Sequence, residues 1–213
     1  MKALEAASSP VRFGEVLKEV ERADGRISAL RFANGEQVEV GRGDTVVLAV
    51  PPIRLNALYP EAAAPEEASA ILNAHFVLED PKHAAKAPPI LGVLGGVTQW
   101  IFPHGDVISL TVSAAEAVEG AERPHEQLVP MLWAETVKAL ELPDYAHYAA
   151  ARIIREKRAT FRQTPENVAK RPKPRTALSN LFLAGDTVDN GLPATIEGAI
   201  RSGETAAKLA CAK

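Results

Sequence analysis

The sequence predicts a mixed α/β fold, in which a parallel sheet is interrupted by an inserted antiparallel domain. Two short apolar runs without alternation, at 45–50 and 181–184, are typical of strands that are covered on both faces of a parallel sheet. A predicted β-meander precedes the first run, and the segment between the two runs combines further strands with two helices. We therefore expect both ends of the chain to share one domain and its middle to form another.

The meander is predicted from two hairpin dipeptides. Asp24-Gly25 and Asn34-Gly35 separate β-like runs, and such dipeptides favour tight antiparallel turns. The three expected strands are residues 13–22, 26–32 and 36–40.

The inserted segment is predicted to be an antiparallel sheet covered by helices, a structure that suits the wall of an apolar cavity. A helix is expected to begin at Pro65, because Glu66 and Glu67 follow and acidic residues are favoured in a first turn. A second helix is expected over 124–140, with an apolar face of Val129, Leu132, Trp133, Val137 and Leu140. The expected strands are residues 74–78, 90–94, 98–102, 107–113 and 148–155.

Composition narrows the function classes. The chain has 213 residues, 46% hydrophobic and 24% charged, which is enough apolar material for one large domain or two small ones. A net charge of −3 gives no reason to expect nucleic-acid binding. The single cysteine, Cys211, excludes an intramolecular disulfide, and no apolar run approaches the roughly 18 residues of a membrane-spanning helix. We expect a cytoplasmic protein, with peripheral membrane contact left open.

The residues with catalytic potential do not form a recognisable constellation. No histidine lies at metal-ligand spacing from another histidine, cysteine or carboxylate, so no metal site is expected. No serine lies in a G-x-S-x-G setting, and the lone cysteine has no positioned partner, so nucleophilic catalysis lacks support. No catalytic residue is assigned. The histidines considered are His75, His83, His104, His125 and His147.

The segment 178–210 reads as a buried strand, a tight turn and a helix. Pro193 suits the first helical position, which would place Leu192 at the N-cap, where leucine cannot accept a backbone hydrogen bond. The N–H groups around Ala194, Thr195 and Ile196 would then be free at the positive end of a helix, a setting that suits a phosphate or an electron-rich ring. The alternative is a C-terminal helix that merely packs on the sheet.

The predicted helix contains two glycines, Gly198 and Gly203, each of which costs about 1 kcal/mol relative to alanine in a helix interior. Small residues at helical spacing let a helix approach a neighbouring backbone closely. The expected packing stripe is Ile196, Ala199, Ile200, Gly203, Ala206, Ala207 and Ala210.

A basic run precedes this segment, and residues 171–175 read as a linker that crosses back to the first domain. A solvated surface is the simpler interpretation of the run. Attraction to anionic lipid head groups is the alternative. Its members are Arg155, Lys157, Arg158, Arg162, Lys170 and Arg171.

The motif LFLAGD, followed by GLPATIEGAIRSGETAA, resembles the C-terminal FAD-contacting motif of the amine oxidase and phytoene desaturase flavoproteins. The unbroken GLPATIEGA is most similar to the squalene-associated branch, the hydroxysqualene dehydroxylases. Weaker similarity covers DTVVLAVPP, ILNAHFVL, QWIF, ISLTVSAA and EKRATF. The resemblance implies an FAD-dependent oxidoreductase that exchanges a hydride between the flavin and a long apolar isoprenoid. It leaves open a flavin amine oxidase or a carotenoid-type desaturase.

The resemblance also implies site residues. Asp186 would accept hydrogen bonds from the ribityl or pyrophosphate side of FAD, although an acidic residue at a turn also caps local N–H groups. Related sequences often carry an aromatic residue after the GD, where this chain has Thr187-Val188. The implied cofactor contacts are Gly185, Asp186, Gly191, Leu192, Pro193, Ala194, Thr195 and Ile196. The candidate substrate-wall residues, with core or hairpin packing as the alternative, are His75, Gln99, Trp100 and Phe102.

One family feature is absent from the sequence. Family members begin with a strand, a G-x-G-x-x-G turn and a helix that hold the ADP part of FAD, and no such motif occurs here. The chain therefore resembles the C-terminal half of a flavoenzyme, whose activity alone is doubtful and whose N-terminal half would come from another chain. A homo-oligomer, or a truncated interaction module without catalysis, is the alternative. The expected domains are 1–53 with 176–213, part of the FAD-binding domain, and 54–175, the substrate-binding domain.

Overall fold

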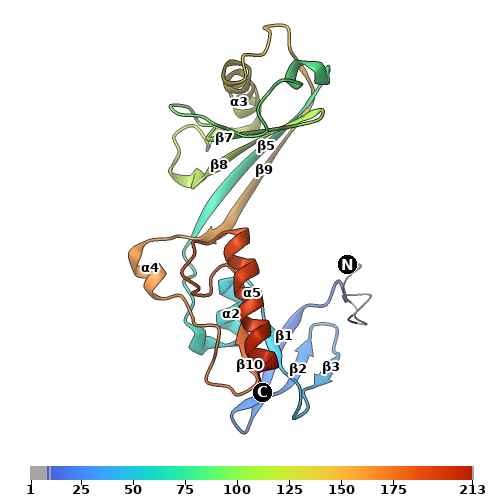
Figure 1. The fold of residues 1–213 in the computed structure, drawn as a ribbon, viewed down its shortest axis with the longest axis vertical. Helices are drawn as coiled ribbons and strands as arrows, with labels where there is room; N and C mark the ends of the chain where they lie inside the picture. The colour runs from blue at the N-terminus through green and yellow to red at the C-terminus, as the bar shows by residue number, and fades with distance from the viewer. Residues whose placement is uncertain (1–8, 10, 213) are drawn as a thin grey trace. The chain divides into compact units, whose positions relative to one another are not determined.

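The computed structural model describes residue 9 and residues 11–212, and its chain forms two compact units (Figure 1). The first unit contains the residues up to Glu66 and those from Gln163 onward, and the second contains Glu67–Arg162. The second unit is shorter than the predicted insertion of 54–175. Two short helices near the ends of that predicted range belong to the first unit instead. The fold is mixed α/β, as predicted.

The predicted meander is present in the first unit as an antiparallel sheet of three strands in sequence order. Asp24 and Gly25 form the first turn with φ of 50° and 71°, and Gly35 in the second turn has φ of 89°. Positive φ at both central residues matches the twist of a tight hairpin, which explains why these dipeptides are good signals. The strands are β1 (Leu17–Ala23), β2 (Arg26–Phe32) and β3 (Gln37–Glu39).

The two buried runs far apart in the sequence pair in parallel, as predicted. β4 (Val46–Leu48) and β10 (Leu181–Leu183) form a two-stranded sheet. The side chains of Leu181 and Leu183 join the larger core of the unit with residues of the meander and of α2. Phe182, on the opposite face of β10, packs with Ala206 of the C-terminal helix α5 (Ile196–Cys211).

The flanks of the insertion differ from the prediction. The helix expected at Pro65 is wrong, because the chain runs directly into a strand at Ala68, and Glu67 already accepts a hydrogen bond from the N–H of Arg162. Three short helical segments were not predicted, namely α2 (Pro52–Leu58), the 3₁₀ turn η1 (Pro60–Ala62) and α4 (Pro165–Ala169). Each has a proline at its start, which presets φ for the first turn.

The second unit is a five-stranded antiparallel sheet in the order β6-β7-β8-β5-β9. All five predicted strands are present, and β5 and β9 are six residues longer than predicted because they pair with each other over most of their length. The strands are β5 (Ala68–Leu78), β6 (Leu91–Gly92), β7 (Trp100–His104), β8 (Val107–Ser113) and β9 (Tyr148–Phe161). The 3₁₀ turns η2 (Pro81–Ala84) and η3 (Ala115–Ala117) complete this unit.

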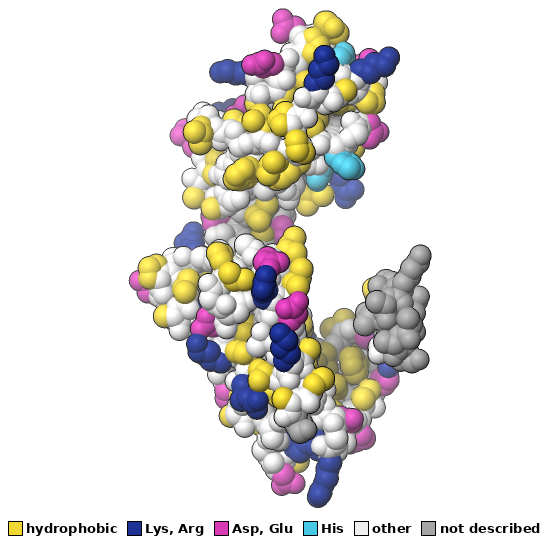
Figure 2. Space-filling view, in the orientation of Figure 1, with side chains coloured by type: hydrophobic (Ala, Val, Ile, Leu, Met, Phe, Trp, Pro, Cys, Tyr) yellow, Lys and Arg dark blue, Asp and Glu magenta, His cyan; other side chains and the backbone are white. Residues whose placement is uncertain are grey.

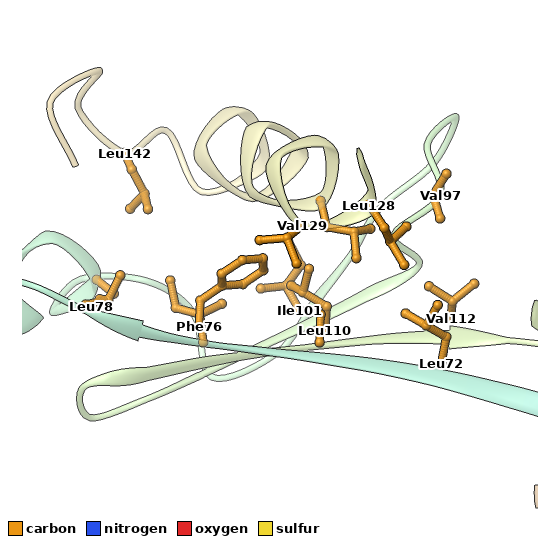
Figure 3. Packing of buried hydrophobic residues seen from close by; sticks show 14 of the residues in the cluster. Leu72, Phe76, Leu78, Val97, Ile101, Leu110, Val112, Leu128, Val129 and Leu142 are labelled. Atoms are coloured by element: carbon orange, nitrogen blue, oxygen red, sulfur yellow. The ribbon is translucent and has the colours of Figure 1, made fainter. Parts of the chain in front are cut away.

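Helix α3 (His125–Ala139) covers one face of this sheet, within the predicted range (Figure 3). Leu128 and Val129 of the helix pack over Phe76 and Leu110 of the sheet, all of them buried. Trp133, Val137 and Leu140, predicted for the same face, are only partly buried at the edge of this cluster. The sheet therefore has one face in the core and one face that α3 does not cover.

Candidate functional site

The turn between β10 and α5 is the first candidate site. Gly185, directly after the strand, has φ of 124°, a conformation that side-chain-bearing residues rarely adopt. Its N–H donates to the hydroxyl of Ser202 at 3.2 Å, which ties the turn to α5. A glycine at this position is thus required by the backbone, whatever the ligand.

The predicted start of α5 is wrong. The helix begins at Ile196, and Thr195 is its N-cap, with the Thr195 hydroxyl accepting the N–H of Gly198 at 3.1 Å. Leu192 and Pro193 belong to the preceding turn. The helix therefore has a side-chain cap, and a missing cap no longer argues for a ligand.

The backbone N–H groups at the helix start are only partly available. Ala194, predicted to be free, donates its N–H to the side-chain oxygen of Gln163 at 3.0 Å. Among the residues that the structure describes, no acceptor faces the N–H groups of Thr195, Ile196 and Glu197. Two of the three predicted donors therefore remain open to a ligand, and Glu197 adds a third.

Gly198 explains how closely the turn approaches the helix. A Cβ added there would lie 2.6 Å from the carbonyl oxygen of Pro193, which is closer than real Cβ atoms come. The amide of Asn190 also donates to the carbonyl of Gly198 at 2.6 Å.

The predicted packing stripe is largely wrong, because the buried face of α5 is formed by Gly198, Ser202 and Ala206, of which only Ala206 belongs to the stripe. Ile196 and Ile200 of the stripe are exposed, and a Cβ at Gly203 would meet nothing within 4 Å.

Arg171 binds the backbone of this turn, a role that the sequence did not reveal. Its side chain is buried and donates hydrogen bonds to four backbone carbonyl groups at 2.7–3.2 Å. The expectation that Arg171 lies on a solvated surface is therefore wrong. The four carbonyl groups belong to Asp186, Thr187, Val188 and Leu192.

Two carboxylates of the turn differ in their surroundings. The hydrogen bond from Lys173 is the main reason why the pKa of Asp189 is lowered, and the N–H of Gly191 adds to it. The half-buried Asp186 carboxylate accepts no hydrogen bond from the described residues, and only its backbone carbonyl is engaged, by Arg171. The alternative of a local capping role for Asp186 thus finds no support in the geometry.

The second candidate site is the sheet face of the second unit that α3 leaves uncovered. His75 pairs across the sheet with Ser109, which in turn pairs with Phe102, so these residues share one face, and Trp100 lies on it two residues before Phe102. Three of the four predicted wall residues are thus brought together. Gln99 is different, because its amide exchanges hydrogen bonds with the backbone of Ser113.

Polar groups on this face are paired with one another. The ring of His75 hydrogen-bonds to the Ser109 hydroxyl at 2.9 Å, and the Thr111 hydroxyl donates to Asn73 at 2.8 Å. Trp100 and Ile154 lie on either side of the Thr111–Asn73 pair, and their side chains are 44% and 40% exposed. This part of the face therefore combines apolar side chains with paired polar groups, and the exposed Arg152 lies beside His75 on the same face.

Two kinds of site do not occur in the described part of the chain. No group of three or more His, Cys, Asp or Glu side chains there is arranged to hold a metal ion. No helix among the same residues is long and apolar enough to cross a membrane.

Comparison with known proteins identifies relatives over the whole chain. A family model described as flavin containing amine oxidoreductase matches residues 1–211. Hydroxysqualene dehydroxylase of Rhodopseudomonas palustris is 43% identical over 97% of this chain and 48% of its own length. The proteins of the same name from Sinorhizobium fredii and Zymomonas mobilis are 40% and 41% identical. The chain spans about half the length of these curated relatives.

Solved structures show the same fold at low identity. An oxidoreductase from Methanosarcina mazei matches with a TM-score of 0.66 at 12% identity, over 97% of this chain and 52% of that chain. A redesigned putrescine oxidase matches with a TM-score of 0.66 at 17% identity, over 96% of this chain and 50% of that chain. Both again correspond to about half of the longer protein.

Proposed function

Because the chain belongs to the flavin containing amine oxidoreductase family, we propose that it is the C-terminal portion of an FAD-dependent oxidoreductase acting on a squalene-type isoprenoid. The similarity to three hydroxysqualene dehydroxylases at 40–43% identity, over nearly the whole chain, carries this proposal. The bound flavin would supply the redox chemistry by exchanging a hydride with the substrate. The residues of this chain would bind the flavin, orient the substrate and exclude water from the site.

The turn after β10 offers groups that fit a flavin cofactor. The unpartnered Asp186 carboxylate is an acceptor for hydroxyl groups, such as those of a ribityl chain. The open N–H groups of Thr195, Ile196 and Glu197 lie at the positive end of α5, where negative charge on a ring is stabilised. We assign cofactor contact to these groups and to the turn 185–194.

The uncovered sheet face of the second unit is the proposed substrate wall. Trp100, Phe102 and Ile154 offer apolar contact to a hydrocarbon chain. The Asn73 and Thr111 side chains that lie between Trp100 and Ile154 are paired with each other. His75 would line this wall as a packed residue. No catalytic residue is proposed.

The adenosine half of the cofactor site is proposed to come from an N-terminal FAD-binding portion outside these 213 residues. Coverage of 48% of the relatives supports this, as does the lack of a G-x-G-x-x-G motif. In the first unit, Ile196 and Ile200 are 83% and 54% exposed along α5, where Figure 2 shows apolar side chains among charged ones. Val47 of β4 is also exposed, and such surface favours a partner or a second copy of the chain. We propose a cytoplasmic location for the assembly, with peripheral membrane contact as the alternative.

Co-expression tests the proposal. The chain is produced with the N-terminal half of the Rhodopseudomonas palustris relative, and the purified pair is examined for flavin absorbance after gel filtration and for turnover of hydroxysqualene and of putrescine. A yellow pair that consumes hydroxysqualene supports the proposal. A colourless pair in added FAD contradicts the cofactor assignment, and turnover of putrescine alone contradicts the substrate.

Asp186→Asn keeps the size of the side chain and removes its charge, and Glu204→Gln on the exposed part of α5 is the matched control. We expect weaker FAD binding by the pair carrying Asp186→Asn only. Equal affinity in both variants would remove Asp186 from the proposed site.

A further inference from the structure

We propose that Arg171 is a positioning residue of the flavin site, which holds the turn 186–192 in the shape that presents Asp186 and the start of α5. This inference rests on the proposed function and deepens it. Arg171 belongs to a segment between α4 and β10, outside the LFLAGD and GLPATIEGA motifs.

The contacts of the guanidinium are specific to arginine. Nε donates to Thr187, Nη1 to Leu192, and Nη2 to both Asp186 and Val188, at 2.7–3.2 Å. A planar fork of five N–H donors can serve carbonyl groups that converge from several directions. A lysine has three donors on one atom and cannot reach the same four oxygens.

Three of the four carbonyl groups come from consecutive residues, 186–188. Their direction determines where the N–H groups of the following residues point. In a planar trans peptide, a carbonyl and the following N–H lie on opposite sides. The Asp186 carbonyl faces Arg171, so the N–H of Thr187 points away from it, while the N–H groups of Val188 and Asp189 are bonded to Gly185 and Pro172. Arg171 thereby sets the orientation of the backbone around Asp186.

Two further side chains, one before α4 and one after it, bind the ends of the turn. Gln163 accepts the N–H of Ala194, and Lys173 hydrogen-bonds to Asp189. Both are peripheral to Arg171, which is the buried member of the three. The shape of the turn therefore depends on residues that precede β10 in the sequence.

The test compares Arg171→Lys with Arg175→Lys, an exposed arginine of the same segment that stacks over Phe182 at 5.4 Å. Amide hydrogen exchange is measured on the full chain without flavin. We expect exchange in residues 187–197 to rise by roughly tenfold in Arg171→Lys only, because buried carbonyl groups lose their donors. The amides of β5 and β8 in the second unit serve as the control for global unfolding.

FAD affinity of the co-expressed pair provides the second readout. We expect Arg171→Lys to weaken FAD binding by roughly tenfold, with turnover at saturating FAD within about twofold of the unchanged protein. If Arg171→Lys does not fold, Arg171→Gln and Arg175→Gln are compared in the same way.

Unchanged exchange in the turn would overturn the inference, and so would faster exchange with unchanged FAD affinity. If the co-expressed pair without any substitution binds no FAD, the proposed function has failed. The exchange experiment then still reports separately whether Arg171 orders the turn.

Discussion

Asn180 shows how one side chain joins parts of the chain that are far apart in sequence. Its amide accepts the N–H of Ile27 at 2.7 Å and donates to the carbonyl of Ile27 at 2.9 Å, and all of these groups are buried. The amide thus takes the place of a neighbouring strand, and it connects the meander to β10.

Replacement of Asn180 by aspartate is expected to destabilise the chain by about 1–3 kcal/mol, because the Ile27 carbonyl loses its donor in a buried setting. The measurement is the free energy of unfolding in urea at neutral pH. Ser179→Ala, at an exposed neighbour, is the control and should change little. An equal effect of both changes would contradict the role of the Asn180 amide.

The two glycines of α5 give a matched pair of substitutions. Gly198→Ala should destabilise the chain, because the new Cβ would lie 2.6 Å from the Pro193 carbonyl oxygen. Gly203→Ala meets open space and should stabilise it by up to about 1 kcal/mol through helix propensity. Thermal unfolding of both variants checks this, and a stabilising Gly198→Ala would show that the turn is not packed against the helix.

At the scale of elements, the sheet and the helix of the second unit are joined by a carboxylate. Glu135 on α3 accepts the N–H groups of Val97 and Thr98 at 2.9 and 2.8 Å, in the loop before β7. Gly96 leaves space for it, since a Cβ there would lie 2.8 Å from a Glu135 oxygen. The loop between β6 and β7 is thereby held to the helix that covers the core.

Glu135→Gln should loosen this loop, since an amide offers one acceptor where the carboxylate offers two. We expect a loss of about 1–2 kcal/mol in the free energy of unfolding. Glu126→Gln on the exposed first turn of α3 is the control. Faster amide exchange at Val97 and Thr98 would locate the effect, and unchanged exchange there would contradict it.

For the whole molecule, the pKa shifts predict sensitivity to acid. The pKa of Glu116 is lowered, chiefly because it accepts the N–H of Ala70, and that of Glu36 is lowered chiefly by the hydrogen bond from Arg12. A carboxylate with a lowered pKa in the folded state stabilises the fold above its unfolded pKa, and this contribution is lost as the pH falls through the folded pKa. The remaining carboxylates of this kind are Glu61, Glu166 and Asp189.

We therefore expect stability to fall as the pH drops below the ordinary glutamate pKa of 4.5. Urea unfolding at pH 7 and pH 3 measures the fall, and Glu116→Gln should reduce the difference between the two conditions. The contribution of the exposed ion pairs is small and is screened by salt. A stability that rises toward pH 3 would contradict the assignment of these shifts.

The association of the two halves can be tested at the same scale. Ile200→Lys should weaken co-purification with the N-terminal half, because a charge would enter the apolar surface of α5. Thr205→Lys, elsewhere on the exposed surface of the helix, is the control. Equal recovery of both complexes would show that the partner docks elsewhere.

Much of the fold could be predicted because its signals are local or strongly apolar. The hairpin dipeptides located the meander, and the amphipathic pattern located α3 to within one residue at each end. The apolar runs at 45–50 and 181–184 indicated the parallel pair, although its strands are shorter than the runs. The helix predicted at Pro65 failed because pairing between β5 and β9 outweighed a favourable first turn.

The sequence by itself determined the meander, the strands of the second unit, helix α3, the pairing of β4 with β10 and the motif that marks the candidate flavin site. Only the tertiary structure decided how that site is built: Thr195 caps α5, Gln163 takes the N–H of Ala194, and Arg171 is buried beneath the turn. The physical reason is the range of the interactions. Turns and periodic apolar faces depend on neighbours in the chain, whereas a guanidinium that binds carbonyl groups 15–21 residues away leaves no periodic pattern in the sequence.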